Sequence, residues 1–276
     1  MGSVRLCYGT PGPRAASGCA NLEVCPTVPG PCPPMKEYYA READRRSWVG
    51  GLFDRTAGDY DRVERAMAFG TGSRYRRRAL QRAGLMPGMN VVDVGVGTGL
   101  VAREAAYLVG DGSRVTGIDP SSGMVEQAKV PAGVRLIAGC AEAIPLPSDC
   151  ADFISMGYAL RHISDLALAF REFWRVLRPG GIMCVLEITQ PEGAVSRALL
   201  KAYMRGVIPM FAYMLARHPE TPKLMRFYWD TIEACAPPRA IMSAITEARF
   251  EDVTRYVELG IFSEYCARKP RAAPTL

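Results

Sequence analysis

The chain has 276 residues, of which 49% are hydrophobic, and a formal net charge of +6 at pH 7, so it can bury one large core or two modest ones. Nine cysteines without a CxxC pair, together with two histidines, lack the spacing of a metal site, and they indicate a reducing compartment. The longest apolar run, VIPMFAYMLA, has about half the length of a membrane-spanning helix, so we expect no integral membrane span and a soluble, cytoplasmic protein.

Residues 1–34 form an N-terminal extension that differs in composition from the rest of the chain. They hold seven of the 21 prolines and four of the nine cysteines, with little apolar periodicity. Such a segment buries too little surface to offset its ordering entropy, so we expect disorder. No uninterrupted apolar stretch indicates a secretory signal, and Met35 is a candidate start.

Residues 35–85 are expected to form an N-terminal helical cap. Charged and apolar residues alternate there at spacings of three and four, with breaks expected at Gly50–Gly51 and Gly58. The run RYRRRALQRAG predicts a further helix that ends at Gly84. We interpret its basic cluster as a solvent-exposed face rather than a nucleic-acid site; the cluster comprises Arg74, Arg76, Arg77, Arg78 and Arg82.

Apolar strands and helices alternate after this cap. The expected strands are NVVDVGV, SRVTGID, GVRLIAG, ADFISMGYA and IMCVLEIT. The expected helices are GLVAREAAYLVG, SSGMVEQAK with Ser121 or Ser122 as N-cap, and SDLALAFREFWRVL, which ends at RPGG. This alternation predicts an α/β fold whose parallel sheet is covered on both faces.

Residues 86–192 and 239–276 are expected to form this core, interrupted by a helical insert at 193–238. The core closes with the helix PRAIMSAITEA and two strand-like runs, VTRYVEL and IFSEYCARK. The insert is rich in methionine and aromatic residues, which fits either core packing or a flexible lid over a lipophilic substrate. These residues are Met204, Met210, Phe211, Tyr213, Met214, Met225, Phe227, Tyr228 and Trp229.

The first expected strand leads into a glycine-rich turn, VVDVGVGTGLV, with Gly95, Gly97 and Gly99 at alternate positions after Asp93. Glycine lets backbone approach a ligand, although a plain tight turn would also explain the pattern. A dinucleotide fingerprint needs a glycine where Leu100 stands. Asp119, at the end of the second strand, could accept both hydroxyls of a ribose or merely cap a helix. The residues alone leave a dinucleotide or an amino-acid nucleoside as the ligand.

The turn resembles motif I of class I S-adenosylmethionine-dependent methyltransferases, E/DxGxGxG. The acid after strand two, the turn GCAEAIPLPSDCADF, VLRPGG before strand five and the C-terminal hairpin follow in that superfamily's order. The resemblance implies a Rossmann-like, seven-stranded, mostly parallel sheet with an antiparallel last strand. It also implies S-adenosyl-L-methionine as cofactor and S-adenosylhomocysteine as product.

A closer resemblance is to the ubiquinone/menaquinone biosynthesis C-methyltransferase family. LFDRTAGDYDRVERAMAFGTGSRYRRRAL and ALRHISDLALAFREFWRVLRPGG are similar to two of its motifs, over about Leu52 to Glu187. The family's C-terminal substrate segment is not recognisable in FYWDTIEACAPPRAI. The resemblance implies C-methylation of a lipophilic quinol-like or isoprenoid small molecule.

We expect the cofactor to contact residues of the glycine turn, the second strand's end and the turn at 140–142. Cys140 stands where many relatives have aspartate, so Glu142 or backbone groups would have to bind the adenine amino group. Tyr60, by resemblance, closes over the methionine end. The expected cofactor-binding residues are Tyr60, Asp93, Gly95, Gly97, Gly99, Asp119, Pro120, Met124, Cys140, Ala141 and Glu142.

The candidate catalytic residues follow the fourth strand in YALRHIS. His162 could act as a base near neutral pH, or could bond the cap of the helix that starts at Ser164. Arg161 could hold an anionic substrate oxygen, or could pair with Glu172. Tyr158 is a candidate ligand contact.

Other functions remain open at this level. An O- or N-methyltransferase of a specialised metabolite needs positioning more than a base, so replacing His162 would discriminate it. A nicotinamide oxidoreductase would be stabilised by NADH alone, and a non-catalytic binding protein could share the fold. A homo-oligomer is also open.

Overall fold

A computed structural model describes residues 35, 37–67, 70–215 and 218–271. The expected N-terminal extension, 1–34, lies outside these residues. The strands are β1 Val91–Val94, β2 Val115–Asp119, β3 Arg135–Ala138, β4 Ala151–Gly157, β5 Leu177–Ile188, β6 Glu251–Glu258 and β7 Phe262–Arg268. The α-helices are α1 Glu42–Met67, α2 Gly72–Arg82, α3 Leu100–Val109, α4 Ser122–Glu126, α5 Leu166–Val176, α6 Ala194–Ala202, α7 Ile208–Leu215, α8 Thr221–Ala234 and α9 Pro238–Glu247. Short 3₁₀ turns lie at η1 Gly112–Arg114 and η2 Leu160–His162, and a π-helical turn lies at η3 Tyr203–Val207.

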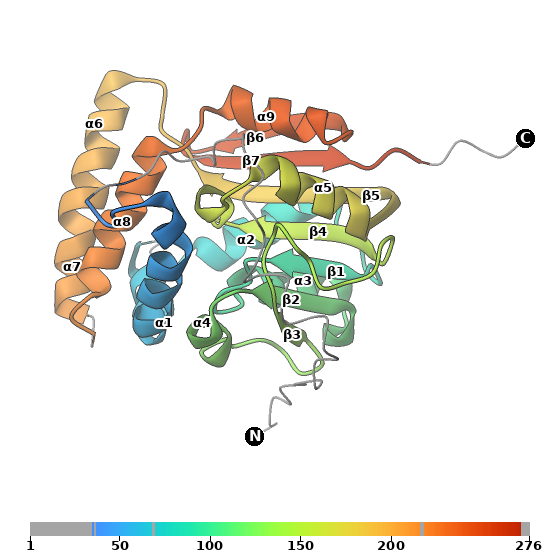
Figure 1. Cartoon of the computed structure of the whole chain (residues 1–276), viewed down its shortest axis with the longest axis horizontal. Helices are drawn as coiled ribbons and strands as arrows, with labels where there is room; N and C mark the ends of the chain where they lie inside the picture. The colour runs from blue at the N-terminus through green and yellow to red at the C-terminus, as the bar shows by residue number, and fades with distance from the viewer. Residues whose placement is uncertain (1–34, 36, 68–69, 216–217, 272–276) are drawn as a thin grey trace, which may run out of the picture.

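The strands form one seven-stranded sheet in the order β3-β2-β1-β4-β5-β7-β6 (Figure 1). Strands β1 to β5 pair in parallel, whereas β7 is antiparallel to both β5 and β6. This is the mostly parallel sheet with an antiparallel final strand that the sequence predicts. The strand order reverses between β1 and β4, and open α/β sheets bind ligands at the carboxyl ends of the strands beside such a point.

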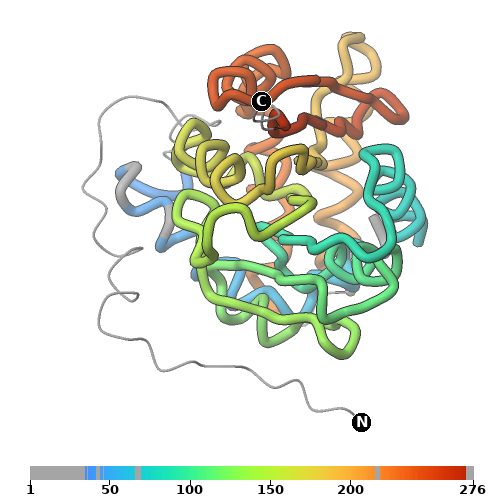
Figure 2. Tube along the Cα trace, turned by 90° about the vertical axis from the view of Figure 1, so that its right-hand side faces the viewer, coloured from blue at the N-terminus to red at the C-terminus, as the bar shows by residue number. Residues whose placement is uncertain are grey.

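Alternation along each strand divides the core between the two faces of the sheet. Val92 and Val94 pack with α5 and α9, whereas Val91 packs with α2 and α3. In Figure 2, α2 lies on the right flank while α5 and α9 lie at the upper left. Apolar residues on both faces explain why these strands read as continuous apolar runs in the sequence.

Helices α1, α6, α7 and α8 stand together at one end of the sheet (Figure 1). They have their own apolar cluster, in which Leu52, Phe227 and Trp229 are buried. The π-helical turn η3 comes just before Pro209, which has no N–H to continue the hydrogen bonding of an α-helix. This assembly covers the carboxyl ends of the parallel strands.

The expected breaks at Gly50–Gly51 and Gly58 are wrong, because α1 runs through all three glycines. Each helical glycine costs about 1 kcal/mol relative to alanine. Packing of Val49, Leu52 and Val63 against α7 and α8 offsets that cost. None of the described helices combines the length and the apolar character that a membrane crossing requires.

Candidate active site

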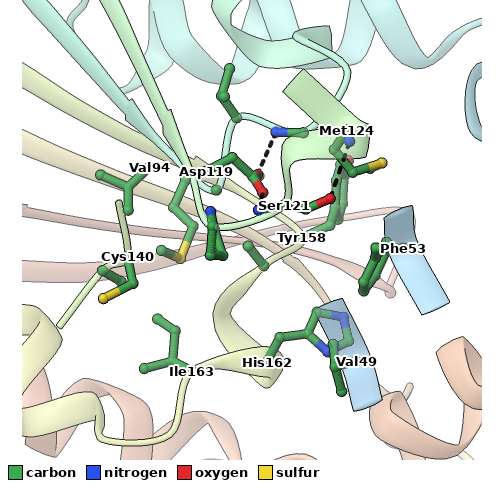
Figure 3. Close-up of a pocket in the computed structure, with 18 of the residues that line it drawn as sticks. Val49, Phe53, Val94, Asp119, Ser121, Met124, Cys140, Tyr158, His162 and Ile163 are labelled. Carbon is green, nitrogen blue, oxygen red and sulfur yellow. Dashed lines mark hydrogen bonds between the residues drawn. The ribbon is translucent and has the colours of Figure 1, made fainter. Parts of the chain in front are cut away.

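A cavity of about 360 Å³ lies at the carboxyl ends of β1, β2 and β4 (Figure 3). Open α/β sheets bind ligands at this edge. The loops that follow β1 to β4 form one side, and α1 forms the other with Val49, Phe53 and Tyr60. In Figure 3, Val49 and Phe53 of α1 face Asp119 across the space. We call this cavity the cofactor cavity.

The glycine turn lies between β1 and α3. Gly95, Gly97 and Gly99 have φ values of +70°, +54° and +86°, which side chains rarely adopt. A Cβ atom at Gly95 would lie 2.6 Å from the Cβ of Ala159, so the loops after β1 and β4 meet there without room for a side chain. Glycine is therefore required at these positions by the positive φ values and, at Gly95, also by the close approach of Ala159.

Asp119 presents a buried carboxylate to the cofactor cavity. Its Oδ2 accepts a hydrogen bond from the Gly97 amide at 2.7 Å, and its Oδ1 accepts one from the Ser121 amide at 2.8 Å. The residue is only 8% exposed, and burial raises its pKa to about 6. Each oxygen retains a lone pair, so the carboxylate has the capacity to accept two hydroxyl groups, as a ribose offers.

Asp93 lies behind the glycine turn and does not line the cofactor cavity. Its Oδ1 accepts a hydrogen bond from the Ser155 hydroxyl at 2.7 Å. Burial raises its pKa to about 7, and its Oδ2 has no hydrogen-bond partner among the residues that the structure describes. The geometry therefore gives Asp93 a supporting position beneath the turn rather than a direct ligand contact.

The turn after β3 brings Cys140, Ala141 and Glu142 into the wall of the cofactor cavity. Glu142 Oε1 accepts a hydrogen bond from the Ser164 amide at 2.9 Å, which ties this turn to the loop after β4. Pro120 and Met124 line the same wall. All five residues were expected to bind the cofactor, and all five line this one cavity.

Two polar contacts attach α1 to the loops beneath it. Asp54 Oδ1 accepts hydrogen bonds from the Ser121 hydroxyl at 2.5 Å and the Gly123 amide at 2.9 Å. About two turns further along α1, Asp61 Oδ1 accepts a hydrogen bond from the Thr98 hydroxyl at 2.5 Å. These hydrogen bonds hold helix α1 over the cofactor cavity.

A second cavity, of about 520 Å³, meets the cofactor cavity at Tyr60, Arg76 and Tyr158, which line both. We call it the acceptor cavity. Seven apolar side chains from β5, α6, η3, α8 and the β6–β7 hairpin line it; they are Ile188, Leu200, Met204, Met225, Leu259, Ile261 and Phe262. Arg74, Arg78, Glu64 and Glu258 add charge.

Tyr158 has a φ of +60°, which is strained for a residue with a side chain. Its amide donates to the Leu186 carbonyl at 2.7 Å, which holds the turn after β4 in place. Strain of this kind is commonly stored at functional sites. The conformation lets the Tyr158 ring contribute to the walls of both cavities.

His162 lies between two aromatic rings in the wall of the cofactor cavity. Its ring stacks on Phe227 at 5.8 Å and meets Phe53 edge-on at 5.3 Å. Neither ring nitrogen has a hydrogen-bond partner within the described part of the chain, so the expected alternative of a helix-cap bond is wrong. Asp165 caps α5 instead. Burial, with Arg161 and Arg45 nearby, lowers the His162 pKa well below its usual value.

Arg161 is fully buried and lines neither cavity. It forms an ion pair with Glu187, so the expected pairing with Glu172 is wrong; Glu172 pairs with Arg175. Its Cζ lies 3.9 Å from the centre of the Tyr228 ring, and its Nε donates to Thr231 at 3.1 Å. Arg161 thus joins β5 to α8.

Arg76 corrects the interpretation of the basic cluster, because it is 3% exposed rather than solvated. Helical spacing is a sequence signal for this burial, because Ala79 and Leu80 follow Arg76 at three and four residues and so share its face of the helix. The α1 residues Arg45, Val49 and Phe53 were also missed, because their role depends on where α1 docks. In the cluster, Arg77 pairs with Glu104 and Arg82 with Glu258 and Glu264.

The glycine turn, the buried acid after β2 and the strand order define an S-adenosyl-L-methionine-dependent methyltransferase of the Rossmann-like class. Residues 40–269 match the ubiE/COQ5 methyltransferase family, and the chain belongs to that family. The match extends beyond Glu187, so the segment in which no family motif was recognisable belongs to it as well. Across the described residues, no group of His, Cys, Asp or Glu side chains could hold a metal ion.

Two relatives from Shewanella are methyltransferases of this kind. The ubiquinone/menaquinone biosynthesis C-methyltransferase UbiE of Shewanella woodyi is 29% identical over 78% of this chain and 88% of its own. The UbiE of Shewanella oneidensis is 28% identical over the same shares.

Two solved structures share the fold. A Thermotoga maritima S-adenosylmethionine-dependent methyltransferase aligns with a TM-score of 0.55 at 22% identity, over 80% of this chain and 99% of its own. Haemonchus contortus phosphoethanolamine N-methyltransferase 2, in complex with S-adenosylhomocysteine, aligns with 0.58 at 17%, over 80% and 60%.

Proposed function

We propose that this methyltransferase transfers a methyl group to a ring carbon of a lipophilic, prenylated hydroquinone. The observation that carries the proposal is the acceptor cavity, which combines an apolar wall around Leu200, Met204 and Met225 with polar groups that include those at its junction with the cofactor cavity. A prenylated hydroquinone has the same division, with an apolar tail and a hydroxylated ring. The names of the Shewanella relatives support the same class of acceptor.

The residues around the cofactor cavity fit S-adenosyl-L-methionine. In our proposal Asp119 accepts the ribose hydroxyls, and the turn Cys140–Glu142 with Pro120 and Met124 surrounds the adenine. The glycine turn admits the chain of the methionine against the backbone, and Asp93 supports that turn from behind. The aromatic faces of Phe53 and Tyr60 on α1 cover the methionine end, where a sulfonium is attracted to aromatic rings.

The bound cofactor supplies an electrophilic methyl group, and the chain's own residues place the acceptor in line with it. Orientation of this kind can lower a barrier by about 7–11 kcal/mol. Tyr60 and Tyr158 define the passage through which the ring meets the methyl group. Helix α1 and the insert 193–238 exclude water from that passage, as a cap and a lid.

The test is methyl transfer from ¹³C-methyl-labelled S-adenosyl-L-methionine to a geranylated naphthohydroquinone kept reduced under argon. We expect an aryl C-methyl resonance in the product and stoichiometric S-adenosylhomocysteine. A labelled methoxy resonance would overturn C-methylation, and absence of any labelled product would overturn the acceptor class. A variant with Leu200→Arg, which places a charge in the apolar wall, should raise KM for this acceptor about 10-fold or more.

A further inference from the structure

The passage between the two cavities contains a buried cation. Tyr60, Arg76 and Tyr158 line both cavities, and Arg76 is the charged member of the three. Its Cζ lies 5.6 Å from the centre of the Tyr158 ring. A guanidinium at this point faces whichever atoms of the acceptor lie nearest the transferred methyl.

Only part of the hydrogen-bonding capacity of Arg76 is used. Its Nη2 donates to Glu64 Oε1 at 2.5 Å, and that carboxylate lines the acceptor cavity. Its Nε is buried and has no hydrogen-bond partner among the described residues. Buried donors without a partner are uncommon in proteins, and this one belongs to a side chain that lines both cavities.

We infer that Arg76 is a catalytic residue that binds a ring hydroxyl of the acceptor as its phenolate. The inference rests on the proposed function, since it assigns the chemistry of the same passage. His162 lines the cofactor cavity but not the acceptor cavity, and Arg161 lines neither. Of Arg76, Arg161 and His162, Arg76 is thus the one that lines both cavities and can meet both ligands.

The methyl transfer needs only the acceptor, the cofactor, Arg76 and solvent. The ring hydroxyl releases its proton to solvent as the acceptor enters, before water is excluded from the passage, and Arg76 stabilises the oxygen's negative charge. The adjacent ring carbon bonds to the methyl group while the carbon–sulfur bond breaks, and sulfur keeps the electron pair. The ring carbon then loses its hydrogen as a proton and the oxygen regains one, so one proton is released for each methyl transferred.

The test measures ionisation of a bound phenol without turnover. The probe is 2-geranyl-4-nitrophenol, whose phenolate absorbs visible light, titrated with pH on the enzyme saturated with S-adenosylhomocysteine. An opposite charge at close range lowers an acid's pKa by about 1–3 units. We expect the bound probe's pKa to lie at least about one unit below that of the free probe.

Four variants locate the origin of that shift. Arg76→Gln should abolish it, and Arg76→Lys should retain part of it, because lysine keeps the charge without the planar fork. Glu64→Gln should enlarge it, because the guanidinium loses its counter-charge. Arg77→Gln is the matched control on the same helix; Arg77 pairs with Glu104, lines neither cavity, and should leave the shift unchanged.

An unshifted probe in the native enzyme, or equal shifts in Arg76→Gln and the native enzyme, would overturn the inference. Should Arg76→Gln fail to fold, Glu64→Gln decides, because it leaves Arg76 in place: a smaller or equal shift contradicts the inference. Failure of the proposed function is distinguishable, since it removes methyl transfer to the hydroquinone while the probe still reports on Arg76.

Discussion

At the scale of single residues, two acids flank the glycine turn, and both are kept from water. Asp93 lies beneath the turn beside Ser155, and Asp119 lies in the cavity wall. Burial raises the pKa of Asp93 to about 7 and that of Asp119 to about 6. A ligand with two hydroxyls would offset the cost of burying the Asp119 carboxylate. It would not do so for Asp93, which is enclosed by protein.

Asp93 therefore predicts a pH dependence of stability. Its pKa in the folded protein exceeds that in the unfolded chain, so its stabilising contribution is full below about pH 4 and is lost as the pH rises through about 7. Asp93→Asn should raise the Tm of the apoprotein relative to native, by more at pH 8 than at pH 5. Calorimetric scans across this range provide the measurement.

Asp111 gives a control of opposite sign. It is exposed, and hydrogen bonds from Ser113 lower its pKa, so its contribution is present above about pH 4 and is lost below it. Asp111→Asn should show no gain in Tm at pH 8. A difference in Tm between Asp93→Asn and the native protein that stays constant with pH would contradict the role given to the burial of Asp93.

His162 is expected to act as an aromatic side chain rather than as a base. Its lowered pKa keeps the ring neutral, and its contacts are with Phe53 and Phe227. His162→Phe should keep kcat within about threefold and leave the pH profile unchanged, because loss of a general base costs about 100-fold or more. A loss of that size, with S-adenosylhomocysteine binding intact, would restore His162 as the base.

At the scale of elements, α1 combines helix-weakening glycines with a functional position. Gly58 is exposed and a Cβ there would have no atom within 4 Å, whereas a Cβ at Gly123 on α4 would lie 2.7 Å from the Asp54 Cα of α1. The first glycine is therefore free to change. The second is required for α1 to approach the cofactor cavity.

This contrast makes a paired prediction. Gly58→Ala should raise the free energy of unfolding by about 0.5–1 kcal/mol, and Gly123→Ala should lower it by about 1–3 kcal/mol. Gly123→Ala should also weaken S-adenosylhomocysteine binding, because Asp54 would lose its bonds to Ser121 and Gly123. Urea unfolding with and without S-adenosylhomocysteine measures the free energy of unfolding and the stabilisation by the ligand. Equal changes in the two variants would contradict the docking of α1.

Much of the fold could be predicted because the parallel strands are buried on both faces. Their apolar runs, the glycine turn and Asp119 are local signals, and the order of strands and helices followed from them. The long path of α1 through Gly50, Gly51 and Gly58 could not be predicted, because its stability comes from packing against α7 and α8. The pairing of Arg76 with Glu64 of α1 and the contacts of Arg161 with α8 also depend on how these helices dock.

At the scale of the whole molecule, the sheet and the helical assembly each supply part of the site. The sheet edge and α1 provide the cofactor cavity, while α2, η3, α8 and the β6–β7 hairpin line most of the acceptor cavity. The two halves meet at Tyr60, Arg76 and Tyr158. Within the insert, Met204 and Met225 are buried and line the acceptor cavity, whereas Tyr213 is 81% exposed.

The central claim is that cofactor and acceptor occupy these two cavities and meet at that passage. A crystal structure of the chain with S-adenosylhomocysteine and the geranylated naphthohydroquinone tests it most directly. The account predicts ribose hydroxyls on Asp119, the prenyl tail among Leu200, Met204 and Met225, and a ring carbon facing sulfur beside Arg76. A hydroquinone bound outside the acceptor cavity, or a nucleoside turned away from Asp119, would contradict the account.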